Sequence, residues 1–332
     1  MKKVFTLSMF LLTFSLIAQE DGEKKKRFNF SGSVDAYFQT YLTAPDNEDV
    51  SFGTAFADQS GFAVGMGNVI ISYEGEKVGA VLDLVVGPRG EGATFNSDIV
   101  DGIVNQAYVY WNVSEKTTLT FGRWNTFLGY EVIAPAANFN YSTSYLFSSG
   151  PFSHLGLKAD FTLGEDFSLM LAITNPWDTN DISMTGEYAL GAQLGYSGQY
   201  LNLYYDSGGH GGLGFEIDYT GGFDLSDSFY LGINAAYNEN DGSGFYGAAL
   251  YPQYTTSDSF AIGFRGEYYG LHGDFEDEVL GLTLTGSYTV EDFIIKPEIR
   301  LDSWGDSMPY IDNDGEATDN LAAFTLAAIY TF

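Results

Sequence analysis

Apolar and polar residues alternate along most of the chain from Phe28 onward, and this two-residue period is the pattern of β-strands whose two faces differ. In the first segment, 28–43, the even positions are mainly apolar and the odd positions mainly polar. Strands of soluble proteins average about five to six residues. A run of this length therefore favours a strand that crosses a membrane within a closed barrel.

Sixteen segments show this pattern. Their expected ranges are 28–43, 61–75, 77–87, 102–113, 117–125, 152–163, 167–177, 187–197, 200–206, 213–224, 229–239, 245–256, 260–271, 278–290, 293–303 and 319–332. Tight polar turns such as Gly75-Glu76 alternate with longer connections, which include 44–60, 88–101, 126–151 and 304–318. Short periplasmic turns that alternate with long outer loops are typical of outer-membrane barrels. The sequence predicts an all-β fold: one transmembrane antiparallel β-barrel of sixteen strands, similar to a porin.

The two ends of the chain fit export to the bacterial outer membrane. Lys2 and Lys3 precede an apolar run that ends at Ala18, which predicts a signal peptide at 1–18 for the Sec pathway. A hydrophilic periplasmic lead at 19–27 and a single barrel domain at 28–332 would follow. The last strand carries Phe324, Tyr330 and the terminal Phe332. Such an ending resembles the signal that the barrel assembly machinery recognises.

Composition excludes several classes of function. The chain has 14 Lys+Arg against 44 Asp+Glu and a net charge of -30, which argues against nucleic acid as a partner because phosphate contacts need basic side chains. With no Cys, the chain cannot form a disulfide, a thiolate metal site or a Cys nucleophile. Nothing in the sequence calls for a cofactor. The partners that remain are outer-membrane lipid and small hydrophilic solutes.

A sixteen-stranded barrel is wide enough to hold water, so we expect an aqueous channel. The charged residues assigned to the channel wall are eight acids and five bases: Asp35, Asp83, Asp160, Glu216, Asp218, Glu267, Glu298, Asp302, Arg123, Lys158, Arg265, Lys296 and Arg300. Their balance predicts a pore that prefers cations. The alternative is that several of these charges pair with one another and only keep the wall polar.

The segment 126–151 is aromatic, and Glu131 is its one ionisable acid or base apart from tyrosine. An outer loop with so much apolar surface would be unusual in water, so we expect it to fold into the barrel and narrow the pore. Folded in this way, Glu131 would lie near Arg123 and Lys158. The alternative is a loop that lies across the barrel mouth or against a neighbouring subunit.

Two prolines lie inside proposed strands, where each removes a hydrogen bond of the sheet. We therefore expect a bulge or a bend at Pro252 and at Pro297.

Part of the sequence resembles the OmpL-like β-barrel porin family. The similar runs are FGRWNTFLGYE at 121–131, NYSTSYLF at 140–147, GPFSHLG at 150–156 and NPWD at 175–178, with Pro176 where the family usually has Gly. The close resemblance covers roughly 121–178. It implies an outer-membrane porin and assigns no binding role to any residue. Analogy with other sixteen-stranded porins suggests a homotrimer.

Three other functions are weighed against a channel. A hydrolase would need a nucleophile beside a base, but Ser153 and His154 are expected on opposite faces, and His210 and His272 lie in loops. Acidic outer loops could bind divalent cations that bridge to lipid headgroups; the residues are Asp274, Glu276, Asp277, Glu278 and those at 312–316. A structural or adhesive surface protein would use the same loops as a partner site and need no open pore.

Overall fold

The computed structural model describes residues 27–47, 50–57, 59–94, 102–177, 179, 186–207 and 212–332. The predicted signal peptide at 1–18 and residues 19–26 of the predicted lead lie outside the described residues. His210 and Asp178 also lie outside them.

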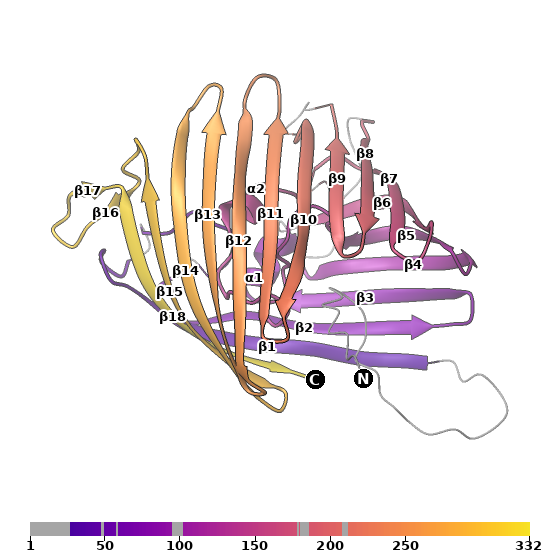
Figure 1. The fold of residues 1–332 in the computed structure, drawn as a ribbon, viewed down its shortest axis with the longest axis horizontal. Helices are drawn as coiled ribbons and strands as arrows, with labels where there is room; N and C mark the ends of the chain where they lie inside the picture. The colour runs from indigo at the N-terminus through magenta and orange to yellow at the C-terminus, as the bar shows by residue number, and fades with distance from the viewer. Residues whose placement is uncertain are drawn as a thin grey trace.

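Sixteen of the strands in the described chain close into one barrel (Figure 1). They are β1 (Arg27–Tyr41), β2 (Gly61–Glu74), β3 (Val78–Val86), β4 (Val104–Ser114), β5 (Thr117–Asn125), β6 (Ser153–Thr162), β7 (Phe167–Thr174), β8 (Ala189–Tyr196), β9 (Gln199–Tyr205), β10 (Phe215–Ser226), β11 (Phe229–Glu239), β12 (Gly244–Ser257), β13 (Phe260–His272), β14 (Asp277–Val290), β15 (Phe293–Trp304) and β18 (Asn320–Thr331). Each pairs with its neighbours in antiparallel fashion. The predicted fold class is confirmed.

The barrel closes where the last strand meets the first. β18 lies between β15 and β1, and Phe332 and Gly32 exchange two backbone hydrogen bonds of 3.0 and 3.1 Å. In Figure 1, β10 to β14 run up the view whereas β2 to β4 run across it. This difference in direction agrees with the strand tilt that barrel closure requires.

Successive side chains of each strand point to opposite faces of the barrel wall, so one face is apolar and exposed and the other is buried. In β1 the side chains of Phe28, Phe30 and Val34 are exposed, while Ser33 and Gln39 are buried on the other face. The exposed apolar rows continue around the barrel and form its outer surface. Because a barrel pairs all its strand edges, no row of backbone N–H and C=O groups is left unpaired in the lipid.

The observed strand ends differ from the predicted ones by at most three residues. The largest difference is in β7, which was expected to reach 177 and ends at Thr174. Asn175 and Pro176 follow, and a proline cannot donate the next ladder hydrogen bond. The strand therefore ends at the residues before it.

The sequence predicts a bulge or a bend at each of the two prolines, and the pairing shows no bulge at either. β12 pairs with β11 through Pro252, and its pairing with β13 has the same register before and after Pro252. Pro297 likewise pairs with Leu326 of β18 without a shift. A register shift lies instead between Val34 and Ala36 of β1, where the side chain of Asp35 accepts a hydrogen bond from the backbone N–H of Met66 (2.9 Å).

Three connections pack against the inner wall. They are 50–57, the segment with helix α1 (Pro88–Thr94), and the segment 126–151 with helix α2 (Tyr145–Ser149). Buried apolar contacts join all three: Phe56, Ala93 and Phe147 belong to one cluster. Both helices are labelled within the outline of the barrel in Figure 1. The apolar core of this barrel therefore lies in its lumen.

The other secondary structure is small. β16 (Tyr310–Ile311) and β17 (Ala317–Thr318) form a two-stranded sheet in the connection between β15 and β18. Over the ranges that the structure describes, no helix has both the length and the apolar character needed to cross a bilayer.

Candidate functional site

The sequence predicts fourteen charged residues in the pore, thirteen on its wall and Glu131 on the segment 126–151. The twelve that are buried are Asp35, Asp83, Arg123, Glu131, Glu216, Asp218, Arg265, Glu267, Lys296, Glu298, Arg300 and Asp302. Lys158 and Asp160 are more accessible, with side chains 25% and 41% exposed, and form an ion pair of 3.2 Å. Most of the charges therefore lie against other protein groups.

Two glutamates of the wall bind the backbone of the segment 126–151. The Glu298 carboxylate accepts hydrogen bonds from the N–H groups of Tyr141 (2.7 Å) and Ser142 (3.0 Å). The Glu267 carboxylate accepts from Tyr145 N–H (2.9 Å) and Leu146 N–H (2.8 Å). Hydrogen bonds to ionised groups are about twice as strong as neutral ones. β13 and β15 thus hold the start of α2 against the wall.

Two arginines bind the carbonyl groups of the same stretch. Arg265 donates to Ser142 O (2.7 Å), and Arg300 donates to Thr143 O (3.1 Å). Arg300 also forms an ion pair with Asp302 (2.7 Å), and its guanidinium lies 4.2 Å from the ring centroid of Phe52. Side chains of the barrel wall therefore bind four N–H groups and two C=O groups of residues 141–146.

Glu131 lies elsewhere than expected. It was predicted to lie near Arg123 and Lys158, but it forms an ion pair with Arg265 (2.8 Å) and accepts from Ser144 N–H and Oγ (2.6 Å each). The reason is the path of the segment, which runs across the lumen toward β13 instead of staying beside β5 and β6. Arg123 binds Ser153 Oγ (3.2 Å), and Lys158 pairs with Asp160.

Arg89 of α1 is an interior residue that the sequence did not reveal. It donates to Ile133 O (3.1 Å) and Tyr141 O (2.7 Å), and its guanidinium lies 5.0 Å from the ring centroid of Phe56. Residues 88–101 had been assigned to an outer loop, so Arg89 was not counted among the lumen charges. A helical start after Gly87, with Pro88 at the first position, was the available signal.

Tyr141 connects the segment to β1. Its hydroxyl donates a hydrogen bond to the Asp35 carboxylate. Burial raises the pKa of the Tyr141 phenol above its ordinary value, because the phenolate would lose its hydration. The phenol therefore stays protonated and remains a donor. Lys296 adds a further contact by donating to Pro135 O (2.9 Å) and to Asn138 O.

Two further carboxylates are held by amide groups. Asp83 accepts from the side chains of Asn105 (2.7 Å) and Asn68 (3.1 Å). Asp218 accepts from Gly129 N–H (3.0 Å) and from the side chains of Asn202 (2.6 Å) and Asn234 (2.5 Å). Neither carboxylate belongs to an ion pair among the described residues.

Ser153 and His154 are the first two residues of β6, and both are buried although the alternation of a strand predicts that they lie on opposite faces. Ser153 was expected to face away from His154, but both side chains are buried. Ser153 Oγ accepts from Arg123, while the His154 ring lies 3.0 Å from Thr126 Oγ1 and stacks on Phe127. Ser153 is thus buried against β5 and His154 against the start of the segment 126–151, so burial alone does not distinguish the two faces at the beginning of β6.

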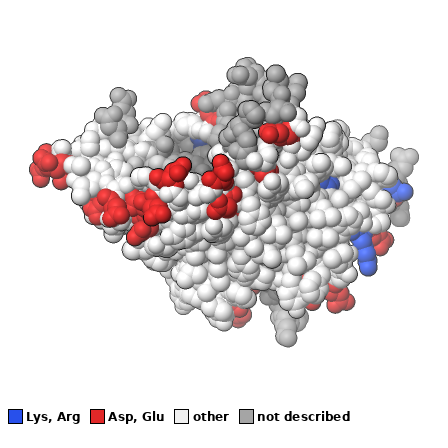
Figure 2. Space-filling model, turned by 90° about the horizontal axis from the view of Figure 1, so that it is seen from above, with Lys and Arg blue, Asp and Glu red and all other residues white. Residues whose placement is uncertain are grey.

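The acidic outer loops carry exposed carboxylates, including Asp274, Glu276 and Glu278. Asp277 is buried and accepts from Asp306 N–H (3.0 Å) and Ser307 N–H (3.1 Å), so it joins two outer loops. Figure 2 shows acidic side chains gathered on this end of the molecule, with few basic ones. The described residues contain no group of three His, Cys, Asp or Glu side chains placed to share one metal ion.

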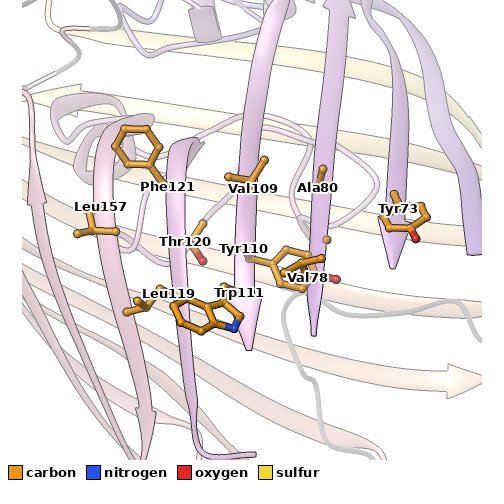
Figure 3. A pocket seen from close by; sticks show the side chains of 11 residues that line it. Tyr73, Val78, Ala80, Val109, Tyr110, Trp111, Leu119, Thr120, Phe121 and Leu157 are labelled. Atoms are coloured by element: carbon orange, nitrogen blue, oxygen red, sulfur yellow. The ribbon is translucent and has the colours of Figure 1, made fainter. Parts of the chain in front are cut away.

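An apolar groove of about 450 Å³ lies on the wall formed by β2 to β6 (Figure 3). Exposed side chains of Val78, Val109, Trp111 and Phe121 line it, and Ala80 leaves room between the larger side chains. The groove belongs to the apolar outer surface of the barrel.

Comparison with known proteins identifies the family. The model of the family described as "Putative beta-barrel porin-2, OmpL-like" matches residues 27–332. The chain belongs to this family. This OmpL-like porin resides in the bacterial outer membrane, as the resemblance at 121–178 implied. No curated protein matched the chain.

Solved structures similar to the OmpL-like porin share its fold. A structure entitled "Asymmetric conductivity of engineered proteins" has a TM-score of 0.57 at 15% identity, covering 92% of this chain and 100% of its own. A mutant of the Rh. blastica porin has a TM-score of 0.55 at 14% identity, with coverage of 92% and 100%. The trimer form of OmpT from Vibrio cholerae has a TM-score of 0.54 at 9% identity, with coverage of 93% and 100%.

Proposed function

We propose that this porin is a passive channel for small hydrophilic solutes, that it prefers cations, and that it performs no enzymatic chemistry. The observation that carries the proposal is the segment 126–151, which lies in the lumen of a closed barrel and is bound there by Glu267, Glu298, Arg265 and Arg300. A segment fixed in the lumen narrows the water path and brings solutes close to the charged wall.

The distribution of charge supports a preference for cations. Three of the wall bases are paired with acids, in the pairs Lys158–Asp160, Arg265–Glu131 and Arg300–Asp302. Asp83 and Asp218 are bound by neutral donors only. With eight acids against five bases, the formal net charge of the predicted wall residues is negative. Lys158 and Asp160, which are the most exposed of the fourteen predicted residues, would meet solutes directly.

We further propose the domain organisation and assembly that the sequence predicts: a signal peptide at 1–18, a lead at 19–27, a barrel at 28–332, and a homotrimer. The trimer form of the structurally similar OmpT supports the proposed homotrimer. Light scattering of the detergent-solubilised protein tests it, and a monomer mass would contradict it.

The experiment that tests the channel is single-channel recording of the refolded mature protein in a planar bilayer under a salt gradient. Stable conductance steps with a cation-selective reversal potential are expected. Steps that select anions would keep the channel and reject the proposed preference. A folded barrel that does not conduct would favour a structural or adhesive surface role.

A further inference from the structure

Glu216 on β10 differs from the other lumen carboxylates in its surroundings. It points to the interior and is 3% exposed, and its neighbours across the sheet are Tyr204 on β9 and Asn238 on β11. On the lumen side lies Gly150, at the end of α2; a methyl group on its Cα would be 4.0 Å from Glu216 Oε1. The carboxylate is thus enclosed between the wall and the segment 126–151.

The nearby donors bind other groups. Asn238 Nδ2 donates to Leu213 O (2.9 Å) and Phe215 O (3.1 Å), and the Tyr204 hydroxyl donates to Asp206 (3.0 Å). The hydroxyl of Tyr269, which is near enough to interact electrostatically with Glu216, is hydrogen-bonded to Ser149 Oγ (2.8 Å). Within the described residues, Glu216 Oε2 has no hydrogen-bond partner.

No positive charge compensates Glu216 within the part of the chain that the structure describes. The ion pairs there involve Lys158, Arg265 and Arg300, and none of them includes Glu216. The nearest charged group along the inner face is another acid, Asp218, whose oxygens are bound by Asn202, Asn234 and Gly129. The charged form of a buried carboxylate that lacks a compensating cation is strongly unfavourable, so such a group takes up a proton, pairs with a cation or binds an ion.

We propose that Glu216 is a binding position for a monovalent cation in the lumen, with Asp218 as the second negative charge beside it. This inference rests on the proposed channel, since a permeating cation would supply the missing charge. Glu216 offers one open carboxylate oxygen, Oε2. Divalent metals need several oxygen ligands, and the described residues place no three acidic or histidine side chains together.

The test compares the wild-type protein with Glu216→Gln and with Glu291→Gln, which removes one charge from an exposed turn. The first measurement is thermal unfolding in detergent at constant chloride, with K⁺ replaced stepwise by the bulky cation N-methyl-D-glucamine. K⁺ should raise the Tm of the wild-type protein and of Glu291→Gln. Glu216→Gln should lose this dependence and be more stable than the wild type without K⁺, because it no longer buries an uncompensated charge.

The second measurement is conductance as a function of KCl concentration. Glu216→Gln should raise the half-saturating K⁺ concentration about fivefold, the factor expected for removing one unit charge at about 4 Å in water. A conducting wild type whose K⁺ dependence is unchanged by Glu216→Gln in both measurements overturns the site and leaves the channel intact. A wild type that does not conduct but is stabilised by K⁺ through Glu216 rejects the channel and retains the site. Absence of both effects rejects both proposals.

Discussion

Glu131 and Arg265 form an ion pair of 2.8 Å across the lumen, although 134 residues separate them in the chain. Both side chains are nearly inaccessible, at 3% and 1% exposure. Arg265 also binds Ser142 O, and Glu131 binds Ser144. The pair therefore connects both arms of the segment 126–151 to β13, and it is the most informative place to perturb the lumen.

Replacing Arg265 by Met should destabilise the barrel by about 3–5 kcal/mol, because it leaves Glu131 as an uncompensated buried charge. Urea unfolding of the refolded protein measures the loss. The double variant Arg265→Met, Glu131→Gln should recover part of it, since the buried charge is then absent. A double variant as unstable as the single one would show that packing of the arginine, not charge compensation, determines the stability.

Weakening the anchors of the segment should widen the pore. Glu267→Gln and Glu298→Gln each remove the charge and leave one acceptor oxygen for two backbone N–H groups, so one hydrogen bond becomes neutral and weaker and the other is lost. We expect larger and noisier single-channel conductance in both variants, and a larger increase after deletion of 132–148. The exposed-turn variant Glu291→Gln serves as the control. Unchanged conductance in the deletion variant would show that this segment does not limit the pore.

Tyr141 should make the protein less stable at alkaline pH. Its pKa in the folded state is raised by burial, so the folded protein retains a proton that the unfolded chain releases above its ordinary pKa of about 10. The stabilisation is complete below that pH and is lost as the pH rises toward the folded-state value. Tyr141→Phe should therefore show a smaller decrease in unfolding free energy between neutral and alkaline pH. Equal slopes for both proteins would contradict the prediction.

The same variant should be less stable than the wild type at neutral pH. Tyr141→Phe removes the hydroxyl that donates to Asp35, a buried carboxylate, and an unsatisfied buried group costs about 1–3 kcal/mol. Chemical denaturation at pH 7 measures this difference. The control is Tyr330→Phe, whose ring is exposed on the outer surface and whose substitution should leave stability unchanged.

The C-terminal strand offers a test in cells. Phe332 is 55% exposed on the outer surface, so Phe332→Ala should change refolding in detergent little. If the predicted assembly signal of Phe324, Tyr330 and Phe332 operates, the variant should accumulate less in the outer membrane. Fractionation of cells expressing each protein measures the amount. Equal amounts of both proteins would exclude Phe332 from the signal.

The alternation of apolar and polar residues is sufficient to predict the barrel. The inward or outward direction of a strand residue is a local property with a period of two, and a closed wall must be apolar outside in lipid. The exposed Phe28 and Phe30 and the buried Arg265, Glu267, Glu298 and Asp302 therefore follow from spacing alone. The strand ends also follow locally, from the polar turns between strands and, for β7, from Pro176.

Which buried charged side chains contact one another depends on the tertiary structure. The segments at 50–57, 88–94 and 126–151 have no period, so their paths depend on where their N–H and C=O groups find partners across the lumen. That dependence placed Glu131 beside Arg265 instead of Arg123, and it brought Arg89 to the backbone of Tyr141. It also enclosed Glu216, whose Oε2 has no hydrogen-bond partner among the described residues. Pairing of buried charges is set by distances between remote parts of the chain, and no local pattern encodes those distances.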